Sequence, residues 1–115
     1  MDKKEVTARV MQKLAYKLFI DDERTPPNNT WTVVRSYEEA IKKIKEKGSP
    51  DFISFDHDLG LGKTGDDFAK WLIDQHLDGN IQFKNNFKFK VHSANPVGKE
   101  NITKRLNNFL KHIRG

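Results

Sequence analysis

Four short apolar runs alternate with stretches of helical periodicity, and this alternation restricts the chain to an α/β fold. The runs cover residues 17–20, 31–34, 52–55 and 87–91. Helical spacing follows each of the last three runs, over residues 36–47, 66–76 and 100–113. Strands that alternate with helices predict a mainly parallel sheet of about four strands, and we expect helices on both of its faces.

The connection between the first two runs departs from this pattern. It covers residues 22–30 and contains Pro26 and Pro27, which block regular backbone hydrogen bonding. A crossover between parallel strands usually needs about a dozen residues or more. We therefore expect the second strand at an edge of the sheet, after a non-helical connection, and its direction stays open.

Length and composition indicate one domain without cysteine chemistry. The chain has 115 residues, and we place the α/β domain at residues 16–115. Residues 1–15 are interpreted as an N-terminal amphipathic helix or extension, because apolar residues recur at helical spacing from Val6 to Leu14. The absence of cysteine excludes disulfides and thiolate metal sites.

No run is long enough to span a bilayer and no signal-peptide core is present, so we expect a cytoplasmic protein without membrane contact.

The chain is basic, with a formal net charge of +5. Lysine and arginine concentrate in residues 42–47, 84–90 and 99–114. This charge favours anionic partners such as phosphates and nucleic acid, although solvated helix faces are the more usual explanation of such a charge. No RNA-binding or zinc-finger motif is present. Contact with nucleic acid through the basic surface stays open, as does the oligomeric state.

Three of the four runs end in polar residues, which form the candidate site. They are Asp21-Asp22, Asp56-His57-Asp58 and His92-Ser93. Open parallel sheets bind ligands outside the carboxyl ends of their strands, so these side chains are expected to meet at one edge. Carboxylate oxygens without thiolates suit Mg²⁺ or Mn²⁺, which makes the four aspartates candidate metal ligands. Alternatively, these acids only cap loops and helix starts.

The two histidines and the glycine-rich loop allow more than one interpretation. His57 and His92 are general acid or base candidates near neutral pH, or plain hydrogen-bonding residues. If the third strand stays extended, Asp58 shares a face with Asp56, where it completes the metal shell or orients a histidine. The loop from Gly60 to Gly65 lacks the first glycine of a P-loop, so a nucleotide triphosphatase is excluded. Its backbone N–H groups can still hold an anion.

At this point the chain resembles response-regulator receivers. The carrying residues are 18–23 (LFIDDE), Phe55-Asp56 and Ser93-Ala94. The resemblance implies a receiver-like (flavodoxin-like) three-layer sandwich, in which Asp21, Asp22 and Asp56 bind Mg²⁺ and Ser93 contacts a phosphoryl oxygen. The helix after the first strand is missing, and no room remains after Ala94 for the fifth strand with its lysine. Signalling by the usual phosphorelay switch is therefore not expected.

Four motifs give a closer resemblance, to the cyclic-phosphate-processing receiver domains. They are residues 20–24 (IDDER) with Pro26, 54–60 (SFDHDLG), 64–65 (TG) and 92–96 (HSANP) with Gly98. They lie between about residues 17 and 102. The resemblance implies processing of a cyclic or terminal phosphate on RNA or a nucleotide.

Our first hypothesis is a metal-assisted phosphoesterase, a hydrolase that acts on a phosphate-containing small molecule or an RNA end. Its catalytic candidates are Asp56, His57 and His92. Its phosphate-binding candidates are Arg24, Ser93 and Asn95. Its Mg²⁺ or Mn²⁺ candidates are Asp21, Asp22, Asp56 and Asp58. The alternative is a non-catalytic receiver-like module that binds a phosphorylated ligand or a protein partner, and phosphorylation of Asp56 is a third possibility.

Overall fold

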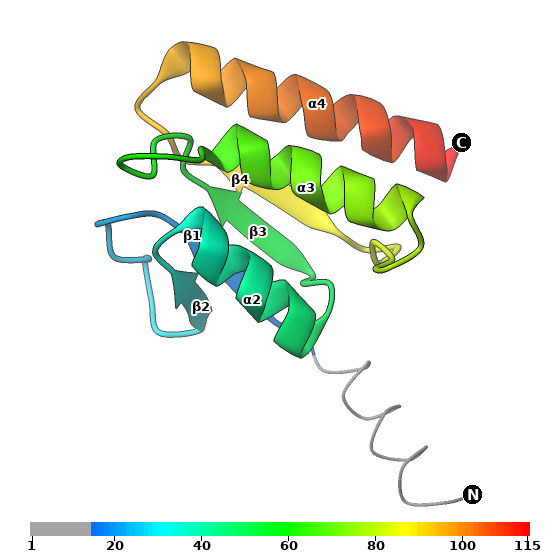
Figure 1. Cartoon of the computed structure of the whole chain (residues 1–115), viewed down its shortest axis with the longest axis horizontal. Coiled ribbons are helices and arrows are strands. Elements are labelled where there is room, and N and C mark those ends of the chain that lie inside the picture. Colours follow the sequence, from blue (N-terminus) through cyan, green and yellow to red (C-terminus); the bar gives the residue numbers. More distant parts are fainter. Residues whose placement is uncertain (1–14) are drawn as a thin grey trace, which may run out of the picture.

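The computed structural model describes residues 15–115 and contains four strands and three helices (Figure 1). The strands are β1 (Lys17–Ile20), β2 (Trp31–Val34), β3 (Phe52–Phe55) and β4 (Lys88–Val91). The helices are α2 (Tyr37–Lys47), α3 (Gly65–Leu77) and α4 (Pro96–Arg114). The predicted N-terminal helix lies outside the described residues.

The four strands form one parallel sheet in the order β2-β1-β3-β4. This result confirms the α/β class and the truncated, receiver-like sheet. β2 lies at an edge, is parallel to β1 and follows a non-helical connection through Pro26 and Pro27, as the sequence indicated.

The described helices form a single layer, whereas we expected helices on both faces of the sheet. In Figure 1 α2, α3 and α4 lie side by side in front of the strands, and α3 contacts both of the other helices. For α2 and α3 the reason is the right-handedness of parallel connections. α4 is followed by no strand and lies in the same layer because it packs against α3. The steps from β2 to β3 and β4 run in one direction, so their connections cover one face. The opposite step, from β1 to β2, would cover the other face, but Pro26 and Pro27 keep that connection free of a helix.

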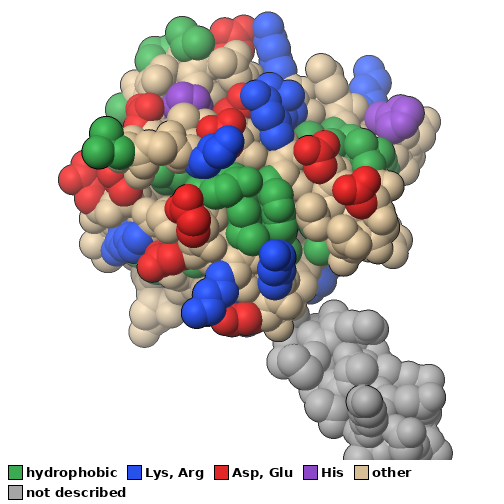
Figure 2. Space-filling model, viewed as in Figure 1, with side chains coloured by type: hydrophobic (Ala, Val, Ile, Leu, Met, Phe, Trp, Pro, Cys, Tyr) green, Lys and Arg blue, Asp and Glu red, His purple; other side chains and the backbone are tan. Residues whose placement is uncertain are grey.

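The core lies between this helix layer and one face of the sheet. Leu18, Ile53 and Phe55 from the strands are fully buried against Phe68 of α3 and Leu106 of α4. Figure 2 shows the outer side of the helix layer, where apolar side chains gather near the centre and charged side chains of both signs surround them. No helix in residues 15–115 has the length and apolar character to cross a membrane.

Side-chain alternation gives the sheet two different faces. The helix-covered face carries Leu18, Ile20, Thr32, Val34, Ile53, Phe55, Phe89 and Val91. The opposite face, here called the aromatic face, carries Lys17, Phe19, Trp31, Val33, Phe52, Ser54, Lys88 and Lys90. No described helix lies on the aromatic face.

Local capping residues fix where the helices start. Thr64 begins α3 with a reciprocal capping box to Asp67, and Ser36 accepts a hydrogen bond from the Glu39 N–H at the start of α2. Asn95 caps α4 through a 3.0 Å hydrogen bond from the Gly98 N–H, and Pro96 takes the first helical position. α4 therefore begins at Pro96, earlier than the residue 100 that apolar periodicity alone indicated.

An ion pair joins the start of α3 to α4. Arg105 Nε and Nη2 lie 2.8 and 3.2 Å from the two carboxylate oxygens of Asp66, which is buried. The two parallel bonds of this fork fix the relative position of the helices more tightly than a single contact would.

Candidate functional site

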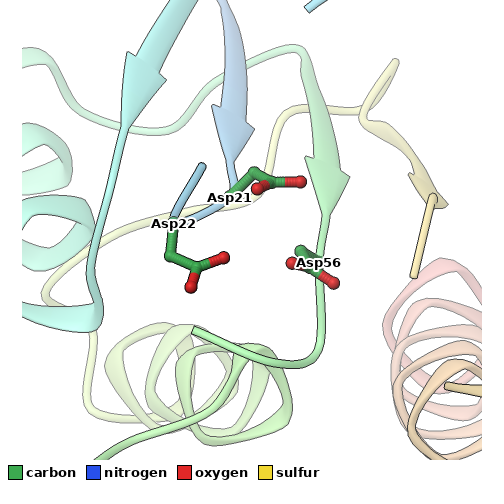
Figure 3. Close-up of side chains that lie close together, drawn as sticks. All are labelled: Asp21, Asp22 and Asp56. Atoms are coloured by element: carbon green, nitrogen blue, oxygen red, sulfur yellow. The ribbon is translucent and has the colours of Figure 1, made fainter. Parts of the chain in front are cut away.

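Three aspartates from two strand ends form a compact acidic cluster (Figure 3). Asp21 and Asp22 follow β1, Asp56 follows β3, and one carboxylate oxygen of each lies within 4.8 Å of the others. Asp21 and Asp56 are buried, whereas Asp22 is exposed. The geometry thus brings together three of the four candidate metal ligands, and leaves Asp58 outside the group.

The backbone ladder positions the cluster. The Asp21 N–H donates to Val34 O at 3.2 Å, and the Asp56 N–H donates to Ile20 O at 2.9 Å. Both residues therefore continue their strands by one step. Alternation places their side chains on the side of Phe19 and Ser54, which is the aromatic face.

Asp21 is held by its own loop. Its Oδ1 accepts hydrogen bonds from the Glu23 N–H at 2.9 Å and the Arg24 N–H at 2.7 Å. Burial alone would raise the pKa of the Asp21 carboxyl. The bonds from Arg24 and Glu23, together with His92, outweigh burial, so the pKa lies below its ordinary value of 3.8. Asp21 is therefore a permanent negative charge in the cluster near neutral pH.

Asp56 has the opposite electrostatic balance. Burial raises the pKa of its carboxyl, the negative charge of Asp21 raises it further, and His92 and other donors offset only part of this. Two buried carboxylates this close repel each other. A bound cation would remove that repulsion, and the oxygen-only donor set fits Mg²⁺ or Mn²⁺.

His92 connects the cluster to the aromatic face. Its Nε2 lies 2.9 Å from Asp21 Oδ2, and its Nδ1 lies 2.7 Å from the buried hydroxyl of Ser54. The ring is stacked on Phe19, with the ring centroids 4.6 Å apart and an angle of 4° between the planes. Both ring nitrogens are therefore engaged, and this geometry suits orientation of Asp21 better than proton transfer to a ligand.

His57, by contrast, packs against the helix layer. A Cβ atom added to Gly98 would lie only 2.3 Å from His57 Cγ, so the imidazole occupies the space that glycine leaves at the start of α4. His57 Nδ1 lies 3.1 Å from Asp58 Oδ1. Asp58 thus contacts a histidine and lies outside the acidic cluster.

A second glycine allows the Asp56-His57 segment to approach α3. A Cβ atom added to Gly65 would lie 1.9 Å from the Asp56 carbonyl oxygen, and the Gly65 N–H donates to His57 O at 2.8 Å. Gly65 and Gly98 therefore fix Asp56 and His57 from two helices. Among the motif residues, Gly65 and Gly98 allow this close packing, and Thr64 caps the start of α3.

Two arginines fix the loop after β1. Arg24 donates from Nη1 to His92 O at 2.8 Å, and its Nε lies 4.0 Å from Asp21 Oδ2. Arg35 donates from Nη1 to Asp21 O at 3.2 Å and to Arg24 O at 2.6 Å. Sequence reasoning missed Arg35. Arg35 could have been identified from its position directly after the second strand, because that strand ends at the same sheet edge as the other site residues.

The remaining phosphate-binding candidates make local hydrogen bonds. Ser93 Oγ accepts from the Asn95 N–H at 3.1 Å, and Asn95 Oδ1 caps α4 through Gly98. The hydroxyl hydrogen of Ser93 and the amide NH₂ of Asn95 are the donors that these bonds leave for a ligand. Gly60 also adjoins the cluster, since a Cβ atom there would lie 3.6 Å from Asp22 Oδ2.

In a comparison with protein-family models, the chain matches the cyclic-phosphate processing receiver domain over residues 16–108. The chain belongs to this family. The match covers both strand ends of the acidic cluster and the end of β4. The cyclic-phosphate processing receiver domain seen here therefore keeps an acidic receiver site on a four-stranded sheet. Comparisons with curated proteins and with solved structures give no match.

Proposed function

We propose that the chain is a metal-assisted phosphoesterase that opens a cyclic phosphate or removes a terminal phosphate on RNA or a nucleotide. The observation that carries this proposal is the convergence of Asp21, Asp22 and Asp56 within 4.8 Å in a cyclic-phosphate processing receiver domain. Two buried carboxylates beside an exposed one favour a bound cation, and the proposed chemistry needs an electrophilic centre beside a phosphate.

Asp22 and Asp56 would be the principal ligands of Mg²⁺ or Mn²⁺. Asp22 is exposed, and burial together with the negative charge of Asp21 raises the pKa of Asp56, so a cation beside Asp56 would offset a charge that is unfavourable there. Asp21 has less free capacity, because Oδ1 holds two N–H groups and Oδ2 holds His92. When bound, the cation would polarise a phosphoryl oxygen and neutralise charge that develops on it.

Arg24 and Ser93 would hold the phosphate. The Arg24 guanidinium is about half exposed and lies at the rim of the cluster, so its free N–H groups can donate to two phosphate oxygens at once. Ser93 would donate its hydroxyl hydrogen to a third oxygen, and the Asn95 amide could add another bond. Arg35 would contribute indirectly, because it keeps the Arg24 backbone in place.

His57 is the candidate for proton transfer, because one of its ring nitrogens is free of hydrogen bonds from the described residues, whereas both nitrogens of His92 are engaged. Asp58 holds Nδ1, and no described residue hydrogen-bonds to Nε2. In the proposed reaction a water oxygen bonds to phosphorus and loses its proton, and the bond from phosphorus to one sugar oxygen breaks. That sugar oxygen then takes a proton, which leaves a phosphate monoester. His57 would accept or donate one of these protons, while His92 would keep Asp21 oriented.

The decisive experiment is a turnover assay of the full chain with Mn²⁺ or Mg²⁺. The substrates are 2′,3′-cyclic mononucleotides and RNA ends that carry a cyclic or terminal phosphate. We expect turnover that Asp56→Asn abolishes and that His57→Ala lowers by about a hundredfold or more. His112→Ala, at an exposed position of α4, is the matched control and should keep full activity. Ligand binding without turnover on the whole panel would refute the proposal.

A further inference from the structure

The aromatic face combines large aromatic side chains with lysines, although a sheet face that only contacts water needs no aromatic residues. Its central residues are Phe19, Trp31 and Phe52, and three lysines lie among them: Lys17, Lys88 and Lys90. No acidic side chain from the four strands points to this face. In ordinary parallel sheets helices cover both faces, but no described helix lies on this one.

Trp31 belongs to the edge strand β2, and its side chain extends over the aromatic face. Its ring makes edge contacts with Phe19 at 6.0 Å and Phe52 at 5.5 Å between ring centroids. Lys17 Nζ lies 4.5 Å and Lys90 Nζ 5.6 Å from the Trp31 ring centroid. The indole N–H of Trp31 is buried and has no hydrogen-bond partner among the described residues. A buried donor without an acceptor costs free energy, which a bound acceptor would recover.

The aromatic face leads directly into the acidic cluster. Asp21 and Asp56 extend β1 and β3, and their side chains lie on this side of the sheet. His92, which holds Asp21, is stacked on Phe19 of the same face. From Lys17 to Asp21 the strand rises by roughly 13 Å, which spans a few stacked nucleotides at about 3.4 Å each.

We propose that the aromatic face binds single-stranded RNA and directs its terminal phosphate to the acidic cluster. Trp31 and Phe52 are partly exposed on this face, whereas Phe19 is buried. Aromatic rings at a protein surface stack on bases of any sequence, and lysines beside them contact the phosphates. A 2′,3′-cyclic phosphate forms only on a nucleotide with a 2′-hydroxyl, which selects RNA over DNA. The position of the RNA end rests on the proposed function, whereas the binding of the strand does not.

The test measures binding of the full chain to a single-stranded RNA of about eight nucleotides with a 3′-hydroxyl end, which the proposed reaction cannot use. Lys88→Gln/Lys90→Gln should weaken binding roughly tenfold and reduce the slope of log affinity against log salt by about 1.4. Lys42→Gln/Lys45→Gln removes the same charge from exposed positions of α2, on the helix side, and should change neither quantity.

A second measurement reports on Trp31 itself. The chain has two tryptophans, so Trp71→Phe leaves Trp31 as the only indole. We expect the same RNA to quench this fluorescence at the concentrations at which it binds. Equal weakening by the two lysine pairs, no RNA binding, or Trp31 fluorescence that depends on protein concentration without RNA would each overturn the proposal. The last result would show that a second copy covers the face.

The two proposals can fail separately. Turnover of a cyclic mononucleotide, with RNA binding unaffected by Lys88→Gln/Lys90→Gln, would leave the phosphoesterase in place and refute the RNA face. Binding of the 3′-hydroxyl RNA through Lys88 and Lys90, without turnover of any cyclic phosphate, would support the RNA face and refute the phosphoesterase.

Discussion

His92 Nε2 lies 2.9 Å from Asp21 Oδ2, so the histidine after β4 orients the carboxylate after β1. β1 and β4 are not neighbours in the sheet, so the contact crosses β3, whose Ser54 hydroxyl lies 2.7 Å from the other ring nitrogen of His92. The acidic cluster therefore depends on three strand ends, although its aspartates come from only two.

We predict that His92→Ala weakens Mn²⁺ binding by roughly 10- to 100-fold. The reason is that Asp21 loses the partner that fixes its Oδ2 atom. Isothermal titration calorimetry checks this, with His112→Ala as the control. Unchanged Mn²⁺ affinity combined with lost turnover would instead mean that His92 acts on the substrate.

Asp56→Asn should stabilise the metal-free protein, because it removes a buried charge that Asp21 repels. We expect a gain on the order of 1 kcal/mol, which corresponds to a few degrees in the melting temperature. The same variant should lose the stabilisation that Mn²⁺ gives the wild type. Thermal unfolding with and without Mn²⁺ measures both effects. Asp74→Asn, an exposed carboxylate on α3, should show neither.

The two buried aspartates should give opposite pH dependences of the unfolding free energy. The pKa of Asp56 is raised in the folded state, so its contribution is full below the ordinary value of 3.8 and is lost as the pH rises through the folded pKa. The pKa of Asp21 is lowered, so its contribution is present above 3.8 and is lost as the pH falls through the folded pKa.

Urea unfolding of the metal-free protein over a pH series separates these effects. Asp56→Asn should remove the loss on the alkaline side, and Asp21→Asn should remove the loss on the acid side. Metal affinity should rise with pH through the folded pKa of Asp56, because the cation displaces its proton. Identical pH profiles for all three proteins would contradict the assigned electrostatics.

Gly65→Ala should destabilise the protein by about 3 kcal/mol and disturb the site. The new Cβ would lie 1.9 Å from the Asp56 carbonyl oxygen, which is backbone and cannot move without displacing β3. Gly79→Ala provides the comparison. Gly79 has a φ of +81° and open space around it, so only the backbone cost of about 1–2 kcal/mol applies. Equal losses in urea unfolding would show that the contact with Asp56 does not matter.

Arg105→Met should cost about 1–2 kcal/mol of unfolding free energy, since it leaves the buried Asp66 carboxylate with weaker partners. The value is modest because the arginine side chain is 36% exposed. Lys104→Met, which breaks an exposed pair with Glu100, should have no measurable effect. If both variants unfold at the same urea concentration, the Asp66–Arg105 pair contributes nothing to stability.

The sequence was sufficient to locate the four strands, because each strand is a short apolar run between turn residues, whereas the direction of the second strand stayed open. Pro26 and Pro27 also indicated the non-helical connection. The position of the helices was not predictable from periodicity. Periodicity indicates that a helix is amphipathic, but it does not indicate which face of the sheet the helix covers. That choice follows from strand order and handedness, and the strand order emerges only in three dimensions.

The candidate site was predictable at the level of strand ends. Asp21, Asp22 and Asp56 follow strands and meet for that reason. The different environments of His57 and His92 were not predictable, because they depend on contacts with Gly98 and Phe19 from distant segments. Asn95 was interpreted as a phosphate ligand, although its place before Pro96 is also typical of a helix cap.

The strand order also determines when the site forms during folding. β1 lies between β2 and β3, and β3 pairs with β4. β1 and β2 are close in sequence, but the β1–β3 and β3–β4 pairings each join strands that are separated by a long stretch of chain. Pairings between segments distant in sequence form late and slowly. Asp21, Asp56 and His92 follow β1, β3 and β4, so the three side chains meet only after β1 has paired with β3 and β3 with β4. The rate at which a refolding chain acquires Mn²⁺ binding would therefore report the rate at which these long-range strand pairings form.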